Sequence, residues 1–111
     1  MATGTIKHSG SVQLLNATNI SSTEATSYSC NWSNYDLLII CGCYYGNVCE
    51  TIVVPKGYFS ETASAQRVKI NNDAYSRKYN VYKNDNNSVY ILADQSETAA
   101  YGIRIYGVKI G

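Results

Sequence analysis

The stretch DLLIICGCYYGNVCETIVVP, residues 36–55, decides the fold class of this chain. Two apolar runs rich in Ile and Val lie on either side of Gly46-Asn47, a pair of residues that tolerates positive φ angles. The stretch therefore predicts a β-hairpin formed by strands Asp36–Tyr45 and Val48–Pro55. Counting outward from the turn, the facing pairs are Tyr45 with Val48, Tyr44 with Cys49, Cys43 with Glu50, and Cys41 with Ile52.

The rest of the chain repeats this pattern of short β-branched and aromatic runs between clusters of Gly, Asn, Asp and Ser. No segment of about ten residues carries the 3.6-residue apolar period of a helix. We therefore expect one all-β domain over residues 1–111, a jelly-roll-like β-sandwich of about nine antiparallel strands with almost no helix. Besides the two hairpin strands, the expected strands are Gly4–His8, Ser11–Leu15, Thr26–Cys30, Gln66–Ile70, Lys78–Lys83, Ser88–Ala93 and Ile103–Ile110.

A second hairpin is expected to turn through the four residues Asn84–Asn87, whose side chains hydrogen-bond their own backbone. This turn pairs Val81 with Tyr90. The predicted faces are Tyr79, Val81, Tyr90 and Leu92 on one side, and Asn80, Tyr82, Val89 and Ile91 on the other.

Both predicted faces carry large apolar or aromatic side chains, so one of them should meet another sheet or another subunit. In the C-terminal strand, Gly107 permits a bulge that would turn Val108 and Ile110 toward one side. We therefore expect self-association, as a trimer, through the Lys78–Ala93 hairpin or through the C-terminal strand.

Composition argues against two classes of partner. Charged residues make up 15% of the chain and the formal net charge is +1, so no strong positive field would attract nucleic acid or anionic lipid. The longest apolar run, Leu37–Cys41, is far shorter than a membrane-spanning helix. The N-terminus also lacks the basic-then-apolar pattern of a secretory signal. The expectation is a soluble protein with neither nucleic-acid nor membrane partner.

The four cysteines, Cys30, Cys41, Cys43 and Cys49, leave two interpretations open. In a small secreted protein they would suggest two disulfides, whereas without a leader reduced and buried thiols are favoured. A zinc site is disfavoured because Cys41 and Cys43 share one face of a strand and lack the tight turn of a zinc knuckle. A disulfide that involves Cys30 or Cys49 remains the alternative.

Catalytic residues are not recognisable. His8 is the only histidine and lies in a short N-terminal strand, so neither a Ser-His-Asp nor a Cys-His arrangement is indicated. No nucleophile elbow, zinc-protease motif or phosphate-binding loop occurs, and nothing singles out a pair among the carboxylates. We expect a protein that is not an enzyme and that uses no cofactor and no metal.

Tyrosine is the strongest anomaly of composition, with eleven tyrosines against one tryptophan and one phenylalanine. A tyrosine side chain joins an apolar ring to a polar hydroxyl, which suits a surface that stacks on sugar rings. About half of the tyrosines are expected to be ordinary strand residues. The candidates for a ligand-binding surface are Tyr44, Tyr45, Tyr75, Tyr82 and Tyr90.

Five segments carry a family resemblance: GTIK (4–7), SVQLLNAT (11–18), YDLLII (35–40), IVVP (52–55) and YGIRIYGVKIG (101–111). In these segments the chain resembles C-terminal receptor-binding head domains of tail-fibre proteins from phages and prophages of Gram-positive gut bacteria. The resemblance implies a β-sandwich, often trimeric, made in the bacterial cytoplasm and displayed at the tail tip of the virion.

The expected function that follows is non-catalytic binding of a bacterial cell-surface polysaccharide or teichoic acid. The alternative is a purely structural fibre tip or trimerisation cap that has no ligand site of its own.

Overall fold

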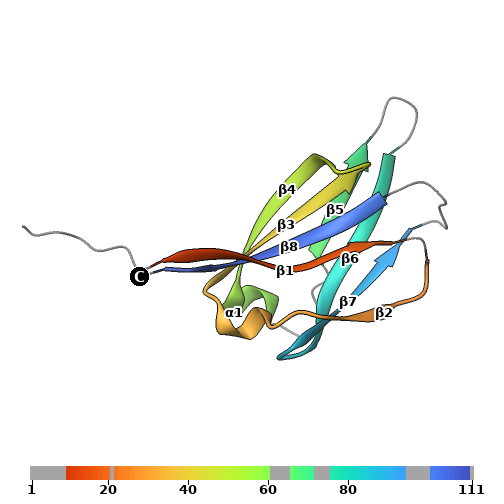
Figure 1. Cartoon of the computed structure of the whole chain (residues 1–111). Helices are drawn as coiled ribbons and strands as arrows, with labels where there is room; N and C mark the ends of the chain where they lie inside the picture. The colour runs from red at the N-terminus through yellow and green to blue at the C-terminus, as the bar shows by residue number, and fades with distance from the viewer. Residues whose placement is uncertain (1–9, 21, 61–65, 72–75, 95–100, 111) are drawn as a thin grey trace, which may run out of the picture.

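The structure is a computed structural model that describes residues 10–20, 22–60, 66–71, 76–94 and 101–110. It is an all-β sandwich of two four-stranded antiparallel sheets, with strand orders β1-β8-β3-β4 and β2-β7-β6-β5 (Figure 1). The strands are β1 (Ser11–Asn19), β2 (Thr26–Ser29), β3 (Leu37–Tyr44), β4 (Asn47–Pro55), β5 (Gln66–Asn71), β6 (Ser76–Asp85), β7 (Ser88–Ala93) and β8 (Tyr101–Lys109). Two short helical turns accompany them, the 3-10 turn η1 (Trp32–Asn34) and the α-helical turn α1 (Lys56–Phe59).

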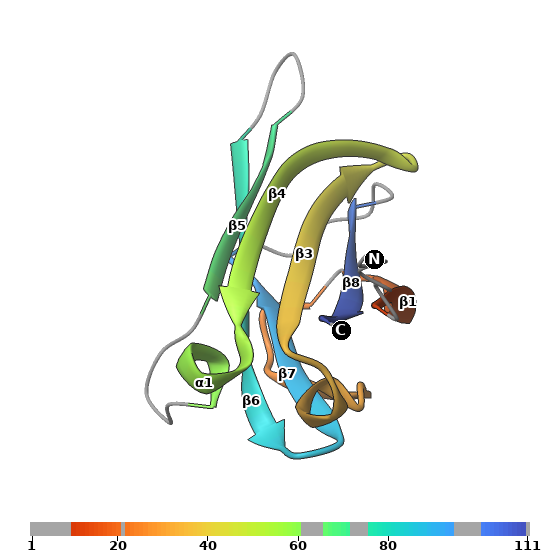
Figure 2. The same ribbon diagram turned by 90° about the vertical axis from the view of Figure 1, so that its left-hand side faces the viewer.

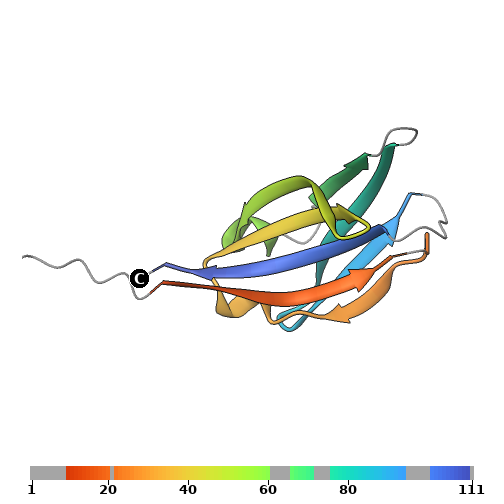
Figure 3. The same cartoon turned by 45° about the horizontal axis from the view of Figure 1, so that its top comes forward.

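Strands from the two ends of the chain pair with each other in both sheets. In the first sheet β1 pairs with β8, and in the second β2 pairs with β7. Figures 2 and 3 show the two sheets as separate layers, with the β1-β8-β3-β4 sheet in front in Figure 3. The fold therefore depends on contacts between residues far apart in the sequence.

The predicted β-sandwich is confirmed, with differences at the strand ends. Eight of the nine expected strands are present, and the ninth, Gly4–His8, lies outside the described residues. The first described strand continues beyond Leu15 to Asn19, because a bulge between Leu14 and Asn16 absorbs a register shift. In the described part of the chain no helix is long and apolar enough to span a membrane.

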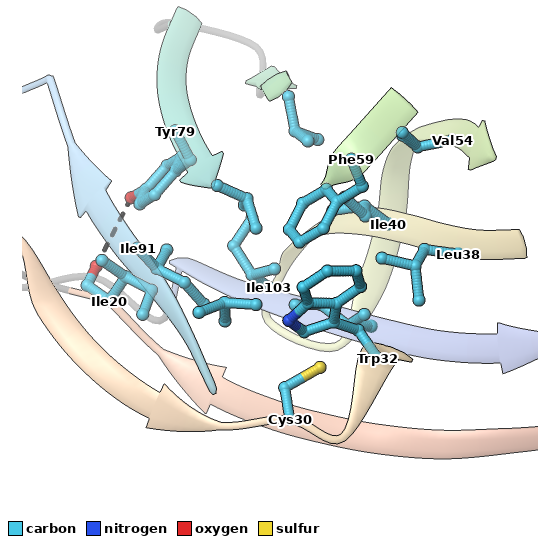
Figure 4. Close-up of a cluster of buried hydrophobic side chains, with 14 of the residues drawn as sticks. Ile20, Cys30, Trp32, Leu38, Ile40, Val54, Phe59, Tyr79, Ile91 and Ile103 are labelled. Carbon is cyan, nitrogen blue, oxygen red and sulfur yellow. Dashed lines mark hydrogen bonds between the residues drawn. The ribbon is translucent and has the colours of Figure 1, made fainter. Parts of the chain in front are cut away.

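One apolar cluster fills the space between the sheets. Residues of η1 and α1 close one end of it, where the rings of Trp32 and Phe59 meet edge to face at 5.0 Å (Figure 4). Trp32 also donates a hydrogen bond of 2.7 Å from Nε1 to the carbonyl oxygen of Asp85. From the two sheets come, among others, Leu38, Ile40, Val54, Val68, Tyr79, Val81, Val89, Ile91, Ile103 and Ile105.

The register predicted for the first hairpin is wrong. The turn residues are Tyr45 and Gly46, with φ angles of 47° and 81°, rather than Gly46 and Asn47. A two-residue turn with positive φ at both positions places glycine second, which moves the turn by one residue. A bulge then leaves Cys49 unpaired, and the observed pairs are Tyr44 with Asn47, Cys43 with Val48, Gly42 with Glu50 and Cys41 with Thr51.

The register predicted for the second hairpin is also wrong. Asp85 pairs with Ser88 across a two-residue turn, and a bulge between Lys83 and Asp85 shifts the pairing of β6 with β7. Because side chains alternate between faces, a shift of one residue moves a whole strand's side chains to the other face. Tyr79, Val81, Val89, Ile91 and Ala93 are buried in the core, and Asn80, Tyr82, Tyr90 and Leu92 alternate with them on the outer face. The prediction of two mixed apolar faces therefore fails.

The bulge predicted at Gly107 is absent. Strand β8 pairs with β3 in an unbroken register, and the irregularity lies in the neighbouring strand β1. Gly107 instead lies beneath the ring of Tyr35, where a Cβ atom would approach the ring to 2.4 Å. Val108 consequently alternates normally and faces away from the core side that Ile105 occupies.

Candidate functional site

The outer face of the β2-β7-β6-β5 sheet brings two of the predicted tyrosines together. Tyr82 and Tyr90 are direct cross-strand partners, with ring centroids 5.3 Å apart and ring planes inclined by 36°. Both side chains are half-buried, so part of each ring remains accessible to solvent. We call this surface the tyrosine face.

Amide and hydroxyl groups surround the two rings. The Asn84 side-chain amide donates hydrogen bonds to the hydroxyls of Ser27, at 3.2 Å, and Ser88, at 2.8 Å. On the β5 side, Arg67 Nε donates to Asn80 Oδ1 at 3.2 Å. These contacts hold the side chains in place while each amide keeps further donor or acceptor capacity. The tyrosine face thus combines aromatic rings with ordered polar groups.

Two of the other predicted tyrosines, Tyr44 and Tyr45, do not join this face. Tyr45 occupies the β3–β4 turn and is 62% exposed, with its ring 4.6 Å from that of Tyr44. Tyr44 packs against the core and lies 4.9 Å from the ring of Tyr101. Tyr75 lies outside the described residues. The four described candidates therefore separate into one pair on the second sheet and one pair at a turn of the first.

The outer face of the β1-β8-β3-β4 sheet divides into an apolar half and a polar half. Strand pairing aligns four rows of residues across this face. The two rows of the apolar half are Val12, Val108, Leu37 and Pro55, and then Leu14, Tyr106, Ile39 and Val53. The two rows of the polar half are Ala17, Arg104, Cys41 and Thr51, and then Asn19, Gly102, Cys43 and Val48.

A pocket of about 180 Å³ opens in the polar half of this face. Gly102, between Asn19 and Cys43 in its row, contributes only backbone to the lining. The Asn19 carboxamide leans over Gly102, with its Oδ1 3.0 Å from the place where a Cβ on residue 102 would lie. The lining residues are Ala17, Thr18, Asn19, Cys43, Gly46, Gly102, Ile103 and Arg104, and we call this the Arg104 pocket.

Arg104 and Asn19 were missed by the reading of the sequence. The available signal was a cation, Arg104, in the middle of the apolar strand YGIRIYGVK, residues 101–109, whose other cation, Lys109, is its last residue. No comparable signal pointed to Asn19, because its strand β1 is brought beside β8 only by the tertiary fold.

The cysteines are free thiols in different surroundings. Cys30, Cys41 and Cys43 are buried, whereas Cys49 at the bulge is exposed. Burial raises the pKa of the Cys30 thiol to about 12, and a hydrogen bond from the backbone of Trp32 opposes this only in part. Burial also raises the pKa of Cys43, against the nearby positive charge of Arg104. Among the residues that the structure describes, no group of three or more potential ligands is arranged to hold a metal ion.

The carboxylates of Asp85 and Asp36 act as structural hydrogen-bond acceptors. Asp85 Oδ1 accepts hydrogen bonds of 2.8 Å from the Asn87 backbone N–H and from the Ser88 hydroxyl, which lower the pKa of its carboxyl group. Asp36 Oδ2 accepts a hydrogen bond of 2.7 Å from the backbone N–H of Ile110. These contacts give both carboxylates a structural role. His8 lies outside the described residues.

Comparison with known proteins assigns no family to the chain: no family model, no curated protein and no solved structure matches it.

Proposed function

We propose that this chain is a non-catalytic carbohydrate-binding head domain of a phage tail-fibre-like protein, which binds a bacterial cell-surface polysaccharide. The observation that carries the proposal is the Tyr82–Tyr90 pair on an outer face of the sandwich, surrounded by ordered amide and hydroxyl groups. In this proposal the domain works at the tail tip of the virion.

The chemistry of the tyrosine face suits a neutral sugar. The apolar side of a sugar ring packs on an aromatic ring, and the sugar hydroxyls exchange hydrogen bonds with amides and hydroxyls at the edge. Asn80, Asn84, Ser27 and Ser88 supply such groups beside Tyr82 and Tyr90. A flat and open surface of this kind gives weak binding per site, which several copies on one fibre would strengthen through multivalency.

The experiment is a screen of the purified chain on an array of bacterial glycans, followed by calorimetric titration of the best ligand. Tyr82→Ala removes one ring of the pair and should weaken binding about ten-fold or more, equivalent to about 1.4 kcal/mol. Tyr82→Phe keeps the ring and should bind within a few-fold of the original chain. Tyr58→Ala is the matched control, because Tyr58 is also exposed, at 58%, but lies in α1.

Two results would overturn the proposal. One is that the chain binds no glycan on the array. The other is a ligand that Tyr82→Ala and Tyr58→Ala bind equally well.

A specific observation favours the structural alternative as a second candidate. The apolar half of the first sheet exposes Val12 (64%), Leu14 (48%) and Val53 (59%) on one continuous surface. We propose that a second copy of this chain covers this surface in a homo-oligomer, for which a trimer remains the expectation. Removing such a surface from water favours association.

In this second candidate the contact between copies no longer involves the Lys78–Ala93 hairpin. It still includes the C-terminal strand β8, which runs through the middle of the first sheet. Sedimentation at micromolar concentration tests it. Val53→Asp should shift the oligomer to monomer, whereas Tyr82→Ser on the other sheet should leave the mass unchanged. A monomeric original chain would contradict this candidate.

A further inference from the structure

Arg104 is a half-buried cation on a face whose described rows contain no carboxylate. Neither the Arg104 guanidinium nor the Asn19 carboxamide has a hydrogen-bond or ion-pair partner in the part of the chain that the structure describes. No residue that lines the pocket carries a carboxylate. A planar guanidinium with unused donors pairs best with a carboxylate or a phosphate group.

The shape of the pocket limits what can enter. A volume of about 180 Å³ lies below the range of about 300–1,000 Å³ typical of sites for whole organic ligands. It suits one charged substituent, with the remainder of the ligand outside.

We infer that the Arg104 pocket is a binding site for the oxyanion group of an acidic ligand, a carboxylate or a phosphate. Arg104 supplies the positive charge, and the Asn19 carboxamide, which has no partner among the described residues to fix its orientation, can turn its Nδ2 donor toward the pocket. Gly102 lines the pocket with backbone alone. The site lies on the first sheet, whereas the tyrosine face lies on the outer face of the second, so this inference does not rest on the proposed function.

The test is a titration of the ¹⁵N-labelled chain, followed by nuclear magnetic resonance, with sodium glucuronate, with glycerol 3-phosphate and with neutral methyl glucoside. Saturable shifts of the Gly102, Asn19 and Gly46 amides are expected with the anions only. A stronger response to glucuronate assigns a carboxylate, a stronger response to glycerol 3-phosphate assigns a phosphate, and equal responses assign a general oxyanion site.

Three variants distinguish anion binding in the Arg104 pocket from non-specific attraction to a positive charge. Arg104→Gln should weaken anion binding about ten-fold or more, as expected for loss of a charge-assisted hydrogen bond. Lys109→Gln removes the same charge from an exposed position of the same strand and should change binding less than about two-fold. Gly102→Ala retains Arg104 but fills the space beside Asn19, so it should also weaken binding.

The inference is overturned if neither anion gives saturable shifts, if Arg104→Gln binds like the original chain, or if methyl glucoside shifts the same amides equally. Tyr82→Ala should leave anion binding unchanged. A failure of this site is therefore distinguishable from a failure of the tyrosine face.

Discussion

Replacing Gly107 with alanine tests how closely the backbone of β8 approaches the ring of Tyr35. A Cβ atom at position 107 would lie 2.4 Å from Tyr35 Cγ and 2.6 and 2.7 Å from its two Cδ atoms. Packed carbon atoms are about 3.5–4.0 Å apart, so the ring would have to move by about 1 Å or more. Tyr35 is only 7% exposed, and its hydroxyl donates a hydrogen bond of 2.7 Å to Gln13 Oε1.

The expected loss of stability follows from these two contacts. Overpacking of an interior site costs about 1–3 kcal/mol. Losing the Tyr35–Gln13 hydrogen bond would cost a further ~0.5–1.5 kcal/mol. Gly107→Ala should therefore lower the free energy of unfolding by about 2–4 kcal/mol, a large part of the stability of a domain of this size.

The assay is urea unfolding followed by the fluorescence of Trp32, which is 1% exposed and reports directly on the core. Gly57→Ala is the matched control, because a Cβ there meets no atom within 4 Å and should stabilise the chain by at most about 1 kcal/mol. In a Tyr35→Ala background, Gly107→Ala should cost less than about 1 kcal/mol. The reasoning is refuted if Gly107→Ala is as stable as Gly57→Ala, or if its cost persists without the ring.

Three further predictions concern ionisable groups. The pKa of Cys30 is raised from 9.0 to about 12, so the free energy of unfolding should fall as pH rises from 9 toward 12. Cys30→Ala should make this fall shallower by up to about 1.4 kcal/mol per pH unit in urea unfolding, and an equal slope would contradict the assignment. The pKa of Asp85 is lowered by the Asn87 N–H and the Ser88 hydroxyl, so its stabilisation is present above the ordinary value of 3.8 and is lost as pH falls through the lowered value. Asp85→Asn should therefore lose less stability than the original chain between pH 6 and pH 3, and identical losses would exclude this role. Exposed Cys49 should react with a thiol reagent before the buried thiols, giving one fast equivalent that Cys49→Ala removes; a second fast thiol in that variant would show that the buried ones open readily.

The sequence alone determined the all-β class and the position of most strands, because both depend on local properties. The alternation of buried and exposed side chains along a strand depends on only a few neighbouring residues, and so do the backbone preferences of turn residues such as Gly46. The strand Ser88–Ala93 was predicted with the bounds that the structure shows. The abundance of tyrosine and the acceptor role of Asp85 in its turn were also visible without tertiary structure.

Only the tertiary structure decided which side chains share a face. Three bulges, at Leu14/Asn16, Gly42/Cys43 and Lys83/Asp85, each shift a strand register. Whether a bulge forms depends on pairing with the partner strand and on packing against the core. One extra residue moves the side chains that follow it to the opposite face of the strand. Because of the bulge in β6, the residue that faces Tyr90 is Tyr82 and not Val81.

The Arg104 pocket was likewise decided by tertiary pairing. Asn19, Gly102 and Cys43 come from three strands that are distant along the chain and become neighbours only when β8 inserts between β1 and β3. Gly46 of the β3–β4 turn joins them in the lining. The residue types on each strand were readable from the sequence, whereas their juxtaposition required the long-range antiparallel pairing that the packed core stabilises.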